Sequence, residues 1–194
     1  MKFTSSAIAA VLGFTSSAFA APTPNNNTGA PAPQSGSSYT TINPTATSLY
    51  EVWTGAVHHG VYYGKIYKSG QTTDITTLAS FDIPAWAEGH TCQFVFELDE
   101  HATLKGSKRF QVFTSQKPAT QSSASWPSGN LRDQHLGLME ATKPGRAAIV
   151  DGPARSTYFP CPGGYTIAGE LVGQNDQVHI EWNTYAAGPK ILIY

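Results

Sequence analysis

The stretch that decides the fold of this chain is Thr91-Cys92-Gln93-Phe94-Val95-Phe96-Glu97-Leu98. Its apolar side chains recur at every second position, so one face of an extended segment carries Cys92, Phe94, Phe96 and Leu98. The opposite face carries the polar side chains of Gln93 and Glu97. A period of two is typical of a strand with one buried face, so we expect a half-buried β-strand here.

The same alternation returns near the end of the chain, in residues 165–171 and 178–182. These two strands are close enough in sequence to pair as a hairpin. The other predicted strands, separated by Gly- and Pro-containing turns, are Tyr50–Trp53, Val61–Tyr67, Thr76–Ile83, Phe110–Thr114, Leu136–Ala141, Ser156–Phe159 and Lys190–Tyr194. About ten short strands without a helical pattern predict an all-β fold, an antiparallel, jelly-roll-like β-sandwich.

The N-terminal residues 1–20 have the features of a secretory signal peptide. Lys2 supplies the positive charge, an apolar stretch follows, and Ala18-Phe19-Ala20 gives the small-x-small pattern of a cleavage site before Ala21. We therefore expect the protein to be exported.

Residues 21–45 are rich in Pro, Asn, Ser and Thr and contain almost no large apolar side chains. Such a segment buries too little surface to offset the entropy of ordering it, so we expect a disordered leader. It carries an N-glycosylation sequon at Asn26. Residues 46–194 are then predicted to form the β-sandwich domain.

The cysteines also fit export. The chain has two, Cys92 and Cys161. In an oxidising compartment an even pair is most simply a disulfide, the alternative being two buried free thiols. Two cysteines alone do not make a structural zinc site, and we expect no metal.

Charge patterning excludes several classes of partner. The chain has 12 Lys and Arg residues, 13 Asp and Glu residues and a net charge of −1. Because no dense basic cluster is present, we expect no nucleic-acid partner. No segment beyond the signal peptide is apolar for long enough to cross a bilayer, so we expect no membrane anchor.

Catalytic motifs are absent from the sequence. It has no nucleophile elbow, no HExxH zinc motif and no phosphate-binding loop, so we expect no cofactor. Glu170 and Glu181 lie on the two late strands, where a hairpin would let them face one groove as the carboxylate pair of a glycosidase. Strand alternation alone accounts equally well for both as solvent-facing residues. His58 and His59 are adjacent and would point to opposite faces of a strand.

Aromatic residues are the remaining indication of a ligand, since flat rings with polar edges suit sugars. Trp86 and Trp126 lie in loop-like sequence and are the candidate ligand contacts. Trp182 alternates with Val178 and Ile180 and is predicted to lie in the core. The full set considered is Trp53, Tyr62, Tyr63, Tyr67, Trp86, Trp126, Trp182 and Tyr185.

From Phe81 onward the chain resembles a fungal secreted family, the ubiquitin-3-binding protein (But-two type) C-terminal domain. The matching pieces are Phe81-Asp82-Ile83-Pro84 leading into Thr91–Phe96, and Tyr158-Phe159-Pro160-Cys161-Pro162-Gly163, with a similar strand, turn and short strand at the end. The resemblance implies an all-β sandwich and a bridge between Cys92 and Cys161. It implies no catalytic residues. The family name points to an intracellular pathway that an exported chain would not meet.

We therefore expect a secreted, non-catalytic extracellular or cell-wall-associated protein that acts by binding or as a surface component, with cell-wall polysaccharide as its partner. One alternative is a secreted effector or elicitor acting on a host protein. A second is a small glycan-active enzyme that uses Glu170 and Glu181.

Overall fold

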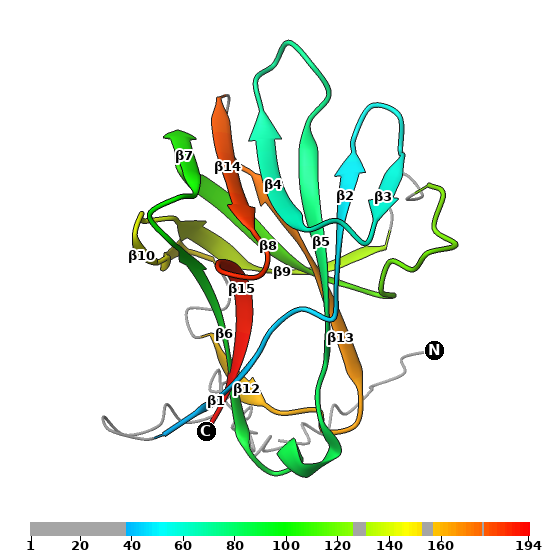
Figure 1. Ribbon diagram of the computed structural model, residues 1–194, viewed down its shortest axis with the longest axis vertical. Coiled ribbons are helices and arrows are strands. Elements are labelled where there is room, and N and C mark those ends of the chain that lie inside the picture. The colour runs from blue at the N-terminus through cyan, green and yellow to red at the C-terminus, as the bar shows by residue number, and fades with distance from the viewer. Residues whose placement is uncertain (1–37, 126–130, 153–156, 176) are drawn as a thin grey trace, which may run out of the picture.

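The computed structural model describes residues 38–125, 131–152, 157–175 and 177–194. The predicted signal peptide, the leader up to residue 37 with Asn26, and Trp126 lie outside the described residues. Within them the chain forms strands and one short 3₁₀-helix (Figure 1). The elements are β1 (Thr40–Ile42), β2 (Ala46–Glu51), β3 (Val57–His59), β4 (Tyr63–Lys68), β5 (Ile75–Asp82), η1 (Ala85–Ala87), β6 (Thr91–Leu98), β7 (Thr103–Gly106), β8 (Arg109–Ser115), β9 (Arg132–Glu140), β10 (Gly145–Arg146), β11 (Ala148–Asp151), β12 (Tyr158–Pro160), β13 (Thr166–Gly173), β14 (Val178–Asn183) and β15 (Gly188–Ile193).

The strands form two antiparallel sheets. The smaller sheet has the order β1-β15-β6-β10, with β12 also paired to β6. The larger sheet has the order β11-β9-β8-β13-β5-β4-β14-β7, with β2 paired to β5 and β3 to β2. The larger sheet curls into a half-barrel. The predicted all-β antiparallel fold is confirmed.

Two apolar cores lie between the sheets, and strand β6 contributes to both. Phe96 packs against the rings of Phe110 and Trp182, with ring centroids 4.7 and 5.0 Å apart. Cys92 lies in the second core, and Phe94 packs against both clusters. The alternating apolar side chains predicted for residues 91–98 are therefore the ones that pack in the two cores.

A third apolar cluster lies on the other face of the larger sheet. It contains Tyr50, Leu78 and Ala119, the last from the long β8–β9 loop. Leu78 and its neighbour Ala79, which belongs to a core between the sheets, point to opposite faces because successive residues of a strand do so. The loop thus covers part of the outer face of the sheet.

Two boundary predictions were wrong. The predicted disordered leader extended to residue 45, yet β1 lies within it and pairs with β15 along the edge of the smaller sheet. The first predicted strand began at Tyr50, whereas β2 begins at Ala46 and ends before Trp53. The physical reason is that the edges of β15 and β5 offer backbone partners to a segment that has little apolar character of its own.

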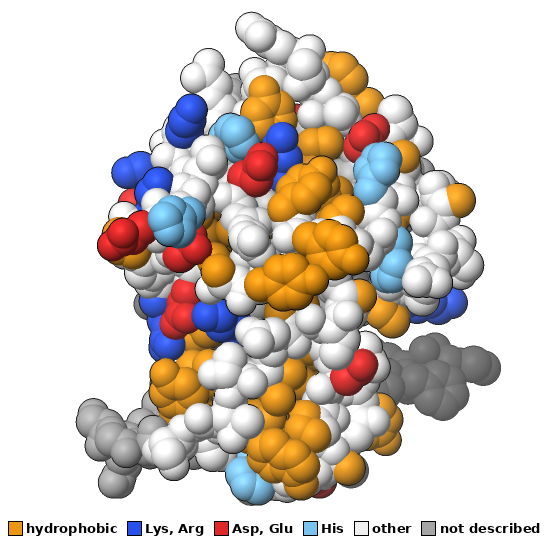
Figure 2. Space-filling model, in the orientation of Figure 1, with side chains coloured by type: hydrophobic (Ala, Val, Ile, Leu, Met, Phe, Trp, Pro, Cys, Tyr) orange, Lys and Arg blue, Asp and Glu red, His pale blue; other side chains and the backbone are white. Residues whose placement is uncertain are grey.

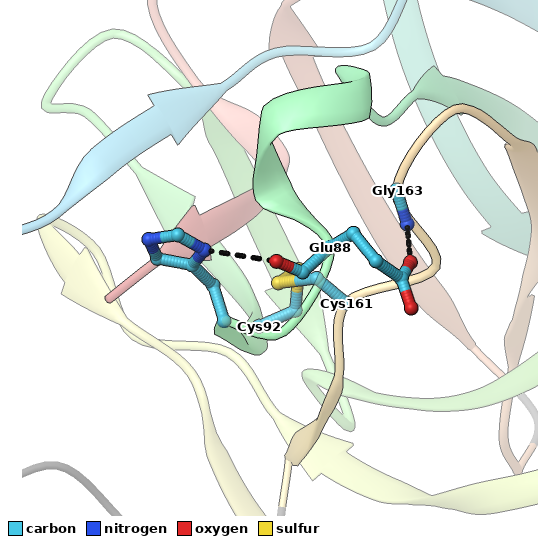
Figure 3. Close-up of a disulfide and its surroundings, with 5 residues drawn as sticks. Glu88, Cys92, Cys161 and Gly163 are labelled. Atoms are coloured by element: carbon cyan, nitrogen blue, oxygen red, sulfur yellow. Dashed lines mark hydrogen bonds between the residues drawn. A yellow bond between two sulfur atoms is a disulfide. The ribbon is translucent and has the colours of Figure 1, made fainter.

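The disulfide is present and buried. Cys92 and Cys161 are bonded, with Cα atoms 4.9 Å apart, and tie β6 to the residue that follows β12 (Figure 3). Beside it, the Glu88 carboxylate accepts a hydrogen bond of 3.0 Å from the backbone N–H of Gly163. A side chain at Gly163 would meet the carbonyl oxygen of Ala85 at 2.9 Å, so only glycine lets this turn lie against η1. The predicted bridge is confirmed.

Candidate functional site

A groove of about 730 Å³ opens on the larger sheet. Its walls come from the segment that joins β1 to β2, from β3 and the loop after it, from the β8–β9 loop and from the turn after β14. The lining residues are Asn43, Pro44, Thr45, Ala46, Thr47, Val57, His59, Gly60, Val61, Tyr62, Gln121, Ser123, Thr184 and Tyr185. The volume lies within the range of small-ligand sites, so the groove is large enough for a ligand.

An exposed aromatic pair forms part of the lining. The rings of Tyr62 and Tyr185 are stacked, with centroids 5.8 Å apart and planes inclined by 18°. Tyr62 is 70% exposed and Tyr185 is 78% exposed, so most of both surfaces is open to solvent. Figure 2 shows hydrophobic side chains grouped near the middle of this face. Large aromatic side chains left in water offer contact area to a ligand.

Backbone hydrogen bonds hold the two tyrosines in place. The N–H of Thr184 donates to the carbonyl oxygen of Tyr62 at 3.1 Å, which joins the β14–β15 turn to the entry of β4. The N–H of Tyr185 donates to the Asn183 side-chain oxygen at 2.9 Å. On the other side, the N–H groups of Gly60 and Val61 donate to the Thr47 carbonyl oxygen. The site therefore rests on strand ends that are fixed to one another.

The lining is polar without formal charge. Among the residues that the structure describes, none of those lining the groove is Asp, Glu, Lys or Arg. The polar groups are hydroxyls and amides, which both donate and accept hydrogen bonds, together with the His59 ring, which shares a hydrogen bond of 2.9 Å with the Ser48 hydroxyl. Since no Lys or Arg side chain is found among the described lining residues, the arrangement suits an uncharged ligand rich in hydroxyl or amide groups.

Glu170 does not face a groove. Its side chain is fully buried, and its oxygens accept two hydrogen bonds of 2.9 Å from Arg132 and one of 2.7 Å from Thr76. Burial raises the pKa of the nearby Tyr50, and the charge on Glu170 raises it further. This carboxylate is a paired, structural one.

Glu181 lies on a different strand of the larger sheet, so the alternative in which it faces Glu170 across one groove is wrong. β13 and β14 do not form a hairpin, because β5 and β4 are inserted between them. The Glu170 carboxylate is also buried against Arg132, so it cannot reach a substrate as one half of a glycosidase pair. Glu181 instead forms ion pairs of 3.3 Å with Lys65 and with His179.

The adjacent histidines point apart, as predicted. His58 contacts the Glu51 carboxylate at 3.0 Å, whereas His59 turns to Ser48. The hydrogen bonds from His58 and Thr54 lower the pKa of Glu51. Across the described parts of the chain, no three His, Cys, Asp or Glu side chains come together as a metal site.

None of the tryptophans that the structure describes lines the groove. Trp86 is 54% exposed on η1, beside the His90 ring at 5.8 Å, and Trp126 lies outside the described residues. Trp182 is buried, as predicted, and its ring leaves no room for a side chain at Gly64. The sequence did not single out Tyr62 and Tyr185 among the eight aromatic residues considered. No motif marked the polar lining residues Gln121 and Asn43 as part of a site. The one available hint that Tyr185 is exposed was its position just after the predicted strand 178–182, where a turn is expected.

Comparison with known proteins gives a family. A family model described as the ubiquitin 3 binding protein But2 C-terminal domain matches residues 60–186. The match begins well before Phe81, where the resemblance was expected to start, and ends before β15, so it includes both groove tyrosines. No curated protein matches the chain. Among the residues described, no helix has the length and apolar character needed to cross a membrane.

Proposed function

Since the chain belongs to the family of the ubiquitin 3 binding protein But2 C-terminal domain, we propose that it is a secreted, non-catalytic β-sandwich protein that acts by binding at the groove of Tyr62 and Tyr185. The observation that carries this proposal is the exposed, stacked tyrosine pair in a groove whose described lining residues include no Asp, Glu, Lys or Arg. We propose that the partner is an uncharged polysaccharide of the cell wall or cell surface.

The two carboxylates considered as a catalytic pair, Glu170 and Glu181, both have charged or hydrogen-bonding partners. General acid–base catalysis requires a group free to exchange a proton with a substrate within hydrogen-bond reach. Glu170 is enclosed by Arg132 and Thr76, and Glu181 is paired with Lys65 and His179. The pairing of both carboxylates supports a domain that binds a ligand rather than one that catalyses a reaction.

Export is supported by two independent features. The N-terminal 20 residues have the pattern of a signal peptide. The two cysteines of the chain are joined in a disulfide, a bond that persists in oxidising compartments. The family takes its name from a protein that binds ubiquitin 3; an exported chain would not meet a partner inside the cell, so we do not propose that one.

The test is capture on insoluble polysaccharide. Purified protein is incubated with chitin and with β-glucan, and the bound fraction is compared for the wild type, the Tyr62→Ala/Tyr185→Ala double variant and a Tyr165→Ala control. Tyr165 is also 70% exposed but does not line the groove. We expect the double variant to lose binding and the control to keep it.

Three results would contradict the proposal. The wild type binds neither polysaccharide, or the double variant binds as well as the control, or the protein releases soluble sugars in a way that Glu181→Gln abolishes without unfolding the domain.

A further inference from the structure

The outer face of β4 and β14 continues directly from the groove. Tyr63 follows Tyr62 in the chain and is 45% exposed at the start of β4. Lys65 and Tyr67 lie on the same face of that strand, because they alternate with the buried Gly64 and Ile66. A rise of about 3.3 Å per residue places Tyr67 about 13 Å from Tyr63, longer than a single sugar ring.

Strand β14 supplies a parallel row of polar groups. Its residues pair with those of β4 in register, so Asn183 lies opposite Tyr63, Glu181 opposite Lys65, and His179 opposite Tyr67. Residues directly opposite on neighbouring strands share one face of the sheet. The row ends at the turn that carries Tyr185, so the strip and the groove form one continuous surface.

The charges on this strip compensate one another. The Lys65 ammonium lies 3.3 Å from the Glu181 carboxylate and 5.3 Å from the centre of the Tyr67 ring, and His179 contacts the same carboxylate. Burial raises the pKa of Glu181, but hydrogen bonds from His179 and Lys65 hold it below its ordinary value. The Lys65–Glu181 pair can still donate hydrogen bonds to hydroxyl groups and accept hydrogen bonds from them. Because its two charges cancel, it does not attract an ionic ligand.

We propose that this strip, from Tyr63 to Tyr67 with its β14 partners, extends the groove into a binding track for an uncharged polysaccharide chain in an extended conformation. The proposal rests on the function proposed for the groove. Tyr63 is the stacking platform next to the groove, and Glu181, Lys65 and Asn183 are the hydrogen-bonding groups along the chain. The site is thereby selective for length: a short oligosaccharide fills the groove alone, and a longer one also reaches the strip.

Calorimetric titration with chitin and β-glucan oligosaccharides of three and of six sugar units tests the inference. We expect the six-unit ligand of one series to bind about tenfold more tightly than the three-unit ligand, and Tyr63→Ala to remove most of that difference. Tyr63→Ala should leave three-unit binding unchanged, Tyr63→Phe should keep the length dependence because it keeps the ring, and Tyr165→Ala should behave as wild type. Thermal melting of each variant shows that it is folded.

The outcomes separate the two proposals. If no oligosaccharide or insoluble polysaccharide binds, the function proposed for the groove fails. If both lengths bind equally tightly, or if Tyr63→Ala weakens both equally, the groove binds but the extended track is refuted. The series that binds distinguishes glucan from chitin as the source of the chain.

Discussion

Replacing Arg132 with methionine should destabilise the domain far more than removing any exposed cation. Arg132 donates two hydrogen bonds of 2.9 Å to Glu170, whose side chain is fully buried. The Arg132→Met variant keeps apolar contact over the Phe113 ring, which lies 4.6 Å from the guanidinium carbon, but leaves the carboxylate without its charge partner. Among the described residues, the Thr76 hydroxyl then remains as the hydrogen-bond donor to this carboxylate.

The expected magnitude follows from that geometry. Removing one partner of a buried ion pair costs about 3–5 kcal/mol. Because the Arg132 side chain is 30% exposed, water reaches part of the vacated space, and we expect the lower end, about 3 kcal/mol. This is a large part of the roughly 5–15 kcal/mol by which a domain is stable.

Urea unfolding followed by tryptophan fluorescence measures the effect. Arg109→Met is the matched control, because Arg109 makes a 2.8 Å pair with Glu140 in which both side chains are more than two-fifths exposed, and such a pair contributes about 0–1 kcal/mol. The double variant Arg132→Met/Glu170→Met should recover most of the loss, since apolar replacement of a whole buried pair is close to neutral. The reasoning is refuted if Arg132→Met costs no more than Arg109→Met at an unchanged denaturant slope.

Two further predictions concern the smaller sheet. Replacing Cys92 and Cys161 with alanine opens a loop with a sequence separation of 69, so the free energy of unfolding should fall by about 4 kcal/mol in the same assay; an unchanged midpoint would contradict this. Burial raises the pKa of Glu97, but hydrogen bonds from Arg146 and Lys190 hold it below its ordinary value. The folded state therefore binds this proton less readily than the unfolded state, so the contribution of Glu97 is present at neutral pH and is lost as the pH falls below about 5. The stability difference between wild type and Glu97→Gln should shrink over that range, and a difference that grows on acidification would show the sign to be wrong.

Local pattern was enough to predict the fold class and the elements that build the core. The alternation of residues 91–98 depends only on which side chains are apolar and which are polar. The alternating apolar side chains of β6 are the ones that pack in the two cores. The same reasoning placed Trp182 in the core, and the two cysteines, with the family resemblance, gave the disulfide. These features follow from sequence because each is decided by a short segment or by the composition of the whole chain.

Tertiary structure decided what pairs with what. Nothing in residues 165–182 indicates that β5 and β4 separate β13 from β14. The alternative that Glu170 and Glu181 face one groove was therefore excluded only by the order of the strands in the sheet and by the burial of Glu170. The groove likewise depends on segments far apart in sequence, which bring Tyr62 beside Tyr185. Strand order and loop closure are set by the combined free energy of contacts across the whole domain. A local pattern reports which face of a strand is buried, but not which strand lies next to it.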